Sequence, residues 1–170
     1  MTRKIIIDCD PGIDDAVAIC TALFDPRLEV LAITPTAGTV EAAQATTNVT
    51  AIVGQLDPPR YPRIGKATPP QNAPVMDDKY LHGSDGLGHC NLESSGRQHQ
   101  TPSEKVIGEL LEDFPDAPSL WYDQACCRAI NAKADEAIDA LAQAGENGFV
   151  QAEHAALDRT SAGAAVTRTS

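Results

Sequence analysis

Four aspartates within eight positions are the residues of this sequence whose types and spacing could do chemistry: Asp8, Asp10, Asp14 and Asp15. They follow three consecutive isoleucines, and a Pro-Gly pair separates the first two aspartates from the last two. Clustered carboxylates without histidine or thiolate partners are hard oxygen ligands, which suit Ca²⁺ or Mg²⁺ better than zinc or copper. The sequence therefore predicts a cation site at which a carboxylate could accept a proton from a metal-activated water during hydrolysis.

The same residues have a structural alternative. Asp14 and Asp15 could simply favour the start of a helix, where negative charge is stabilising, and Asp8 could be an ordinary residue at a strand end. For a single acidic pair this alternative would be preferred. Four unpaired acids around one turn would repel each other, so we favour a site that attracts a cation.

The elements around the turn are expected to form a strand-helix-strand unit. Residues 5–7 are β-branched and predict a buried strand, and apolar residues recur at helical spacing over residues 16–24. Asp25-Pro26 ends that helix, and residues 28–33 predict a second strand. This order predicts a parallel sheet, in which ligands bind beyond the carboxyl ends of the strands. Asp10 lies at such an end.

The remainder of the chain predicts further elements around the same rim of the sheet. Residues 34–39 leave the second strand as a loop, and residues 41–56 predict a helix with one apolar face. Residues 61–74 are rich in proline and predict an irregular connection around a very short strand near Arg63-Ile64. Residues 81–89 hold three glycines and predict a loop that could line a site, although plain turns are commoner.

After the glycine-rich loop the sequence predicts helices and no strand. Thr101-Pro102-Ser103-Glu104 is a typical helix start, and Phe114-Pro115 ends that helix. Residues 132–144 predict an alanine-rich amphipathic helix, and residues 160–170 are expected to be frayed.

The composition limits the partners and the compartment. The 170 residues carry a net charge of -11, which argues against a nucleic-acid surface because phosphate binding needs clustered Lys and Arg. The five cysteines are odd in number and lack metal-ligand spacing, so we expect reduced thiols and a cytoplasmic location. Only three apolar residues lie between Lys4 and the first aspartate, too few for a signal sequence or a membrane span, and no membrane partner is expected.

The run Asp8-Cys9-Asp10-Pro11-Gly12-Ile13-Asp14-Asp15-Ala16 closely resembles the N-terminal signature of the inosine-uridine preferring nucleoside hydrolases. These are calcium-dependent enzymes that hydrolyse the N-glycosidic bond of ribonucleosides. Further matches follow in the family's order over residues 4–115: Leu31-Ala32-Ile33-Thr34, Thr36-Ala37-Gly38, Asn48-Val49, Gly65 and His82-Gly83-Ser84-Asp85-Gly86-Leu87-Gly88. The resemblance implies an α/β fold with an open, mostly parallel sheet and flanking helices, a Rossmann-like nucleoside hydrolase core.

The resemblance also implies roles for individual residues. Asp10 matches the residue that binds calcium and activates the attacking water, and Asp15 matches a second calcium ligand. Asp14 matches the residue that hydrogen-bonds ribose hydroxyls, and His82 matches a histidine on the leaving-base side of the pocket. We expect Asp8 to support the others from behind. The family also implies a ribonucleoside substrate and association into homo-oligomers.

Two departures from the family pattern stand out. Thr39 occupies a position where the family commonly has a substrate-contacting asparagine. We expect Thr39 to touch the substrate, and its shorter side chain with a different donor pattern leaves the nucleoside preference open. The second half of the family pattern is not visible after Asp116, which divides the chain into an incomplete hydrolase-like part, residues 1–115, and a divergent helical or partly disordered segment, residues 116–170. We hypothesise a truncated or frame-shifted gene product with impaired activity.

Two alternative functions remain at this point. The chain could be a non-catalytic remnant that binds calcium or ribose without turnover. Alternatively, Asp8-Cys9-Asp10 could be the Asp-x-Asp of a haloacid-dehalogenase-like phosphatase, but that pattern places Thr or Val where this chain has Gly12, and it does not predict the pair at 14 and 15.

Overall fold

A parallel sheet forms the centre of the first part of the molecule. The computed structural model describes residues 2–71, 79–94 and 101–149. Within them, β1 (Arg3–Cys9), β2 (Leu28–Pro35) and β3 (Arg63–Ile64) pair in parallel in the order β1-β2-β3. The predicted parallel sheet is confirmed, and the very short third strand lies at the two residues predicted for it.

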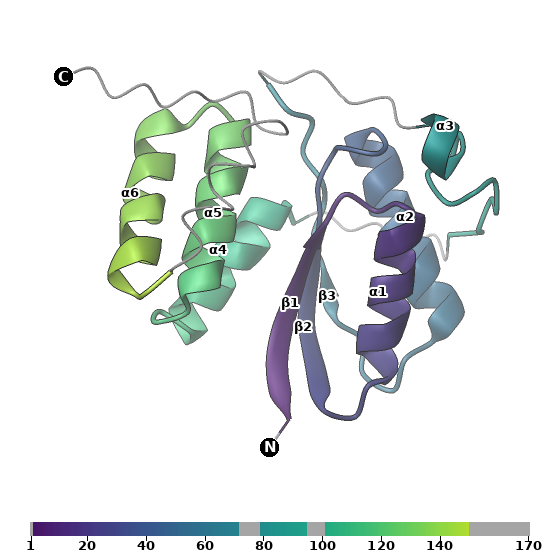
Figure 1. The fold of residues 1–170 in the computed structure, drawn as a ribbon, viewed down its shortest axis with the longest axis horizontal. Coiled ribbons are helices and arrows are strands. Elements are labelled where there is room, and N and C mark those ends of the chain that lie inside the picture. Colours follow the sequence, from purple (N-terminus) through teal and green to yellow (C-terminus); the bar gives the residue numbers. More distant parts are fainter. Residues whose placement is uncertain (1, 72–78, 95–100, 150–170) are drawn as a thin grey trace. The chain divides into compact units, whose positions relative to one another are not determined.

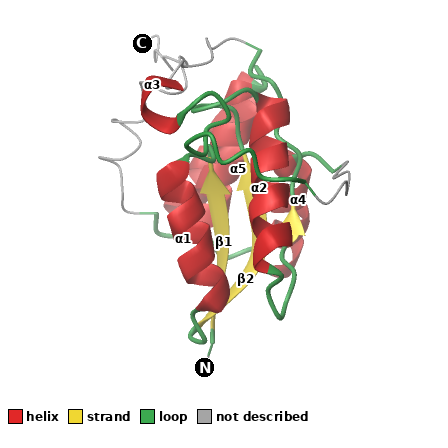
Figure 2. Cartoon of the chain, turned by 90° about the vertical axis from the view of Figure 1, so that its right-hand side faces the viewer, coloured by secondary structure: helices red, strands yellow, loops and turns green. Residues whose placement is uncertain are grey.

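Two helices cover one face of this sheet, α1 (Ile13–Phe24) and α2 (Ala42–Leu56). Figures 1 and 2 both show them on the same side of the strands, as expected when both crossovers run in the same direction along the sheet. Their inward side chains meet those of the strands in one hydrophobic core, formed by Cys9, Ile19, Ile33, Val49, Ile52, Val53, Ile64 and Leu87. The predicted α/β fold with flanking helices is therefore confirmed.

The register of β1 and β2 brings the ends of both strands to the same level. Ile7 pairs with Ile33 and Cys9 with Pro35, after a register shift between Ile5 and Ile6. Beyond the paired residues, the amide of Thr36 donates to the carbonyl of Cys9 at 2.8 Å. The loop that follows β2 is therefore held against the turn that follows β1.

Helix α2 is buried around more of its circumference than its sequence predicts. Alanine and valine form the expected apolar face, but Asn48 and Thr50 are only 3% and 4% exposed. The helix begins at Ala42, with Glu41 as its N-cap. Asn48 is therefore an internal polar residue that must find hydrogen-bond partners inside the protein.

The glycine-rich segment contains a short helix that the sequence did not predict. Residues Lys79–His82 form α3, a single turn of four residues, and the loop that follows carries positive φ angles at Gly83, Gly86 and Gly88. Helix α4 (Ser103–Asp113) lies where a helix was expected. The hydroxyl of Ser103 donates to the carbonyl of Pro35 at 2.8 Å, which ties the start of α4 to the end of β2.

The described residues cluster into two units. The first contains the described residues within 2–69, 79–94 and 101–106, and the second contains those within 70–71 and 107–149, so the division falls inside α4. In the second unit α5 (Pro118–Ile130) and α6 (Ala134–Glu146) pack against each other. The alanine-rich helix predicted near residue 132 is confirmed as α6, whereas the tail predicted to fray, residues 160–170, lies outside the described residues.

Two sequence expectations concern the whole chain. All five cysteines lie in described positions, and none of them forms a disulfide there. Within the described stretches, no helix combines the length and apolar composition that crossing a membrane requires.

Candidate functional site

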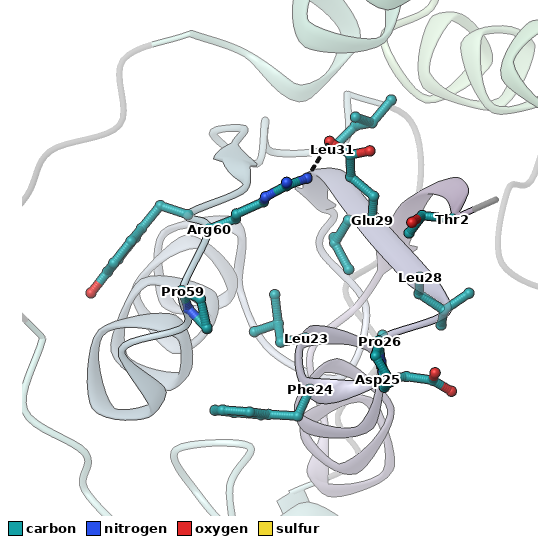
Figure 3. Close-up of a pocket in the computed structure, with 13 residues that line it drawn as sticks. Thr2, Leu23, Phe24, Asp25, Pro26, Leu28, Glu29, Leu31, Pro59 and Arg60 are labelled. Carbon is teal, nitrogen blue, oxygen red and sulfur yellow. Dashed lines mark hydrogen bonds and ion pairs between the residues drawn. The ribbon is translucent and has the colours of Figure 1, made fainter.

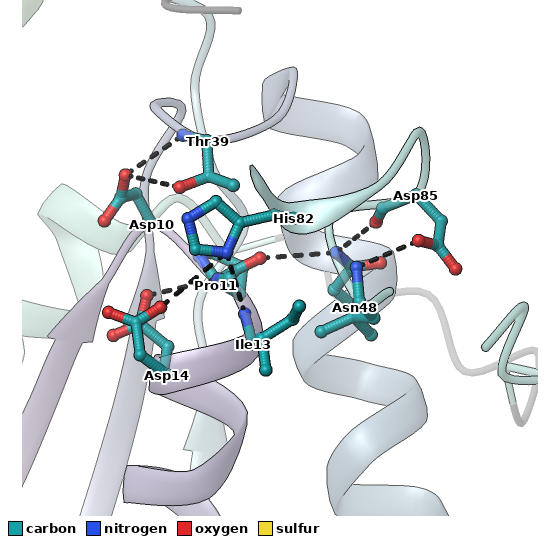
Figure 4. A network of polar contacts seen from close by, with 11 residues as sticks. Asp10, Pro11, Ile13, Asp14, Thr39, Asn48, His82 and Asp85 are labelled. Carbon is teal, nitrogen blue, oxygen red and sulfur yellow. Dashed lines mark hydrogen bonds and ion pairs between the residues drawn. The ribbon is translucent and has the colours of Figure 1, made fainter. Parts of the chain in front are cut away.

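Asp10 lies just beyond the carboxyl end of β1, and its side chain is fixed by the loop that follows β2 (Figure 4). The backbone amide of Thr39 donates to Oδ2 of Asp10 at 3.0 Å, and the Thr39 hydroxyl donates to the same oxygen at 3.1 Å. Thr39 is 7% exposed, whereas Asp10 faces solvent. The structure thus brings two predicted site residues together by direct hydrogen bonds.

Asp15 and Asp14 lie in the first turn of α1 but point to different surroundings. The amide of Gly12 donates to Oδ2 of Asp15 at 3.2 Å, so this carboxylate caps its own helix, as the structural alternative supposed. Burial raises the pKa of Asp15, and the negative charges of Asp10 and Asp14 raise it further against the opposing effect of the Gly12 amide. The three carboxylates are close enough to repel each other, which favours a cation near them.

His82 lies over the start of α1, at the end of α3. Its Nδ1 accepts the amide of Ile13 at 3.3 Å and lies 3.9 Å from Oδ1 of Asp14, whose side chain is 83% exposed. A Cβ added to Gly12 would lie 2.8 Å from Nδ1 of His82, so only glycine permits this approach. Figure 4 shows His82 between Asp14 and the Asp10-Thr39 pair. The structure thus brings two further predicted site residues, Asp14 and His82, close together.

The loop that carries His82 is held in place by Asn48 and Asp85. Nδ2 of Asn48 donates to the carbonyl of Asp85 at 2.8 Å and to that of Pro11 at 3.4 Å. The carboxylate of Asp85 accepts three backbone amides at 2.9 Å each, from Leu87, His89 and Asn91. Neither residue was singled out from the sequence as part of the site. The only sequence signals for them were that Asn48 lies within a predicted helix and that Asp85 lies among glycines.

Asp8 is hydrogen-bonded to the neighbouring strand β2. Its Oδ1 accepts the hydroxyl of Thr34 at 2.9 Å, and this threonine is fully buried on β2. Between Asp8 and Asp10, the buried Cys9 has a pKa well above its usual range, because of burial first and then the charges of Asp15, Asp8 and Asp10. The Asp8-Thr34 bond adds to the pairing of β1 with β2.

The donor chemistry of the cluster fits Ca²⁺, but the number of carboxylates is small. Asp10 and Asp15 present hard oxygens in a region of mutual repulsion. Among the residues that the structure describes, no group of three or more His, Cys, Asp or Glu side chains is arranged to hold a metal ion. Because Ca²⁺ takes roughly six to eight oxygen ligands, Asp10 and Asp15 could supply only part of its shell.

A separate pocket of about 510 Å³ lies near the amino ends of the same strands (Figure 3). It is lined by residues of β2, by the end of α1 and by the segment after α2, including Phe24, Glu29 and Arg60. Arg60 and Glu29 form an ion pair there at 3.1 Å. None of the predicted site residues lines it, and ligands of parallel sheets bind at the opposite, carboxyl end. We therefore place the candidate site at the carboxylates.

Comparison with known proteins identifies a family of relatives. The family model for inosine-uridine preferring nucleoside hydrolases matches residues 5–156, so the match continues past residue 115, where the motif resemblance ended. The non-specific ribonucleoside hydrolase RihC of Salmonella enteritidis PT4 is 35% identical over 117 residues, which are 68% of this chain and 38% of that protein. The inosine-uridine preferring nucleoside hydrolase of Leishmania major is 39% identical over 91 residues, 54% of this chain and 29% of that protein.

Solved structures give the same family. The purine-preferring ribonucleoside hydrolase from Gardnerella vaginalis superposes with a TM-score of 0.59 at 27% identity, over 66% of this chain and 37% of that one. The plant nucleoside hydrolase PpNRh1 gives a TM-score of 0.61 at 28% identity, over 75% of this chain and 43% of that one. This chain thus spans less than half the length of each of these relatives. Its sequence and fold show that it belongs to the inosine-uridine preferring nucleoside hydrolase family.

Proposed function

We propose that this chain carries the metal- and ribose-binding side of the active site of a ribonucleoside hydrolase. Such an enzyme cleaves the N-glycosidic bond to give ribose and the free base. The observation that carries the proposal is the placement of Asp10 at the carboxyl end of β1, tied to Thr39 and close to Asp14 and Asp15. Membership of the family supplies the reaction class.

The chemistry of this bond suits the charges of the site. Breaking the C1′–N bond builds positive charge on the ribose, which nearby carboxylates stabilise. Asp10 would accept the proton of the attacking water, and the exposed carboxylate of Asp14 would hydrogen-bond the ribose hydroxyls. His82 would lie on the side of the departing base. Asp10 and Asp15 would be the carboxylate ligands of Ca²⁺, which would supply a water of lowered pKa for the attack.

The substrate class is proposed more broadly than one nucleoside. The relatives carry names that point to different preferences: non-specific for the Salmonella protein, inosine-uridine for the Leishmania protein and purine for the Gardnerella protein. We propose ribonucleosides as the class for this chain and leave the base open. We also propose that the chain associates into homo-oligomers, as the family resemblance implies. A cytoplasmic location is proposed because the five thiols are expected to be reduced.

The direct test is ribose release from inosine and from uridine by the purified chain, with added Ca²⁺ and with a chelator. Release that requires Ca²⁺ and is lost in Asp10→Ala is expected. Asp139→Ala is the matched control, because Asp139 lies exposed on α6, in the other unit. Folded, soluble protein that releases no ribose from either nucleoside would refute catalysis by this chain.

A second candidate is a binding module without turnover. It is favoured by one observation: among the described residues, no group of three or more His, Cys, Asp or Glu side chains is arranged to hold a metal ion. In that case calorimetry would detect Ca²⁺ or ribose binding that Asp10→Ala weakens, with no ribose released from nucleosides.

A further inference from the structure

We propose that Gly38 and Thr39 form a cradle that positions Asp10, and that Thr39 acts through Asp10 and not on the substrate. The inference rests on the proposed function, in which Asp10 is the proton acceptor. It also replaces the expectation that Thr39 takes over the substrate contact made by asparagine elsewhere in the family.

Both hydrogen bonds of the cradle go to one oxygen. The amide and the hydroxyl of Thr39 donate to Oδ2 of Asp10 at 3.0 and 3.1 Å. Among the described residues, nothing donates a hydrogen bond to Oδ1. Two donors on one oxygen fix the carboxylate plane and leave Oδ1 as the oxygen available to a metal ion or to the proton of an attacking water.

Gly38 allows the carboxylate to lie this close to the loop. A Cβ added to Gly38 would lie 2.3 Å from Oδ2 and 2.7 Å from Cβ of Asp10. These distances are too short for any side chain, and φ at Gly38 is not positive, so the requirement for glycine here is steric. Asp10 therefore packs directly on the backbone of the loop that donates to it.

The cradle is anchored from behind. The amide of Gly38 donates to the carbonyl of Val40 at 3.2 Å, and Val40 is buried with Ala42, Ala45 and Ala67. Thr39 itself is 7% exposed. A hydroxyl has one proton to donate, and that of Thr39 is donated to Asp10. The Thr39 hydroxyl therefore has no second proton with which to donate a hydrogen bond to a nucleoside.

The first test measures the position of Asp10 without metal or substrate. Three-bond couplings from Cγ of Asp10 to its backbone N and C′ report the χ1 rotamer by NMR. We expect one rotamer in the wild type and in Thr39→Ser, and averaged couplings in Thr39→Val. Thr36→Val is the matched control, because the Thr36 hydroxyl in the same loop donates to the carbonyl of Cys9 at 3.2 Å. Couplings in Thr39→Val equal to those of the wild type would overturn the proposal.

Gly38→Ala provides a second variant in case Thr39→Val does not fold. It keeps both Thr39 donors and should move the Asp10 couplings by steric displacement alone. Unchanged couplings in folded Gly38→Ala would equally contradict the cradle.

The second test separates positioning from substrate contact. Loss of a group that orients a ligand or base commonly costs about 10–100-fold in metal affinity or activity. Thr39→Val should therefore weaken Ca²⁺ binding in calorimetry and lower kcat by about that factor with KM nearly unchanged, and Thr39→Ser should restore both. A raised KM with unchanged kcat and unchanged Ca²⁺ affinity would show substrate contact instead. A wild type that binds no Ca²⁺ and releases no ribose would refute the proposed function, while the NMR test would still decide the cradle.

Discussion

Asn48, in the middle of α2, donates from Nδ2 to the carbonyl of Asp85 at 2.8 Å and so joins a core helix to the glycine-rich loop. The same nitrogen reaches the carbonyl of Pro11 in the aspartate-rich turn at 3.4 Å. One buried amide therefore fixes the loop that carries His82 relative to the turn that carries Asp10. The two segments lie more than seventy residues apart in sequence, so this contact is one that only the fold can create.

Removal of this amide should destabilise the protein and release the loop. Asn48→Ala leaves buried carbonyls without donors, a loss of about 1–3 kcal/mol for each such group. Chemical denaturation measures the loss, and hydrogen exchange of the Gly88 amide, which donates to the carbonyl of His82 at 2.7 Å, should speed up. Gln44→Ala is the control. Nε2 of Gln44 donates to Oδ1 of Asn48 at 2.8 Å, at the opposite end of the amide from Nδ2, so its removal should change exchange in the loop much less.

The ionised carboxylate of Asp85 should stabilise the glycine-rich loop, so the conformation of this loop should depend on pH. Burial alone would raise its pKa, but the amides of Asn91, Leu87 and His89 outweigh burial and hold the pKa below the ordinary value. The stabilisation is therefore present above the ordinary pKa of aspartate and is lost as the pH falls through the lowered one. NMR shifts of the three amides should move together in acid. In Asp85→Asn this shared transition should be absent, and its persistence there would assign it to another group.

The strands and helices of the first unit could be predicted because burial determines them. The apolar runs before Asp8 and before Thr34 have to be covered, and Ile19, Ile33 and Val49 meet in one core whatever the details of the loops. Helix α3 was missed because four residues are too short to show a period. The frame-shift hypothesis stays untested, although a family match over residues 116–156 counts against it, since a shifted frame would not keep family-like residues.

The sequence predicted which residues belong to the candidate site, but it did not predict which of them contact each other. The sequence pointed to Asp10, Asp14 and Thr39, yet the Thr39 hydroxyl meets a carboxylate twenty-nine positions away, a pairing that depends on how β1 and β2 align. The role of Asn48 could not be predicted, because its hydrogen bonds to Pro11 and Asp85 run to segments distant in sequence. Periodicity identifies which side chains are buried but not which buried polar groups face each other.

Alanine substitutions at Gly86 and Gly88 should distinguish the stability cost of steric overlap from that of backbone strain. Both have positive φ, +79° and +69°, so alanine at either position should cost about 1–2 kcal/mol of stability. At Gly86 an added Cβ would also lie 2.6 Å from Cγ1 of Val40, whereas at Gly88 the nearest atom is Cδ1 of Ile13 at 3.5 Å. Gly86→Ala should therefore lose roughly 1–3 kcal/mol more in urea unfolding. Equal losses at the two positions would contradict the packing of Gly86 against Val40.

In the second unit, Asp123 should lower the stability of the folded state at neutral pH. Burial in α5 raises the pKa of its carboxyl to about 6. Between the ordinary pKa of aspartate and that value the folded state binds more protons than the unfolded state, so stability falls as the pH rises from about 4 to 6. At 1.36 kcal/mol per pKa unit the total is on the order of 3 kcal/mol.

Asp123→Asn should remove this dependence, since the neutral amide has no proton to lose. The variant should be more stable than the wild type at pH 7 and about equal to it near pH 4, as measured by urea unfolding at several pH values. Asp139→Asn is the control, because Asp139 is exposed on α6, so the replacement changes the net charge equally without affecting a buried group. If both variants changed the pH dependence equally, the effect would come from net charge, and burial of Asp123 would not be its cause.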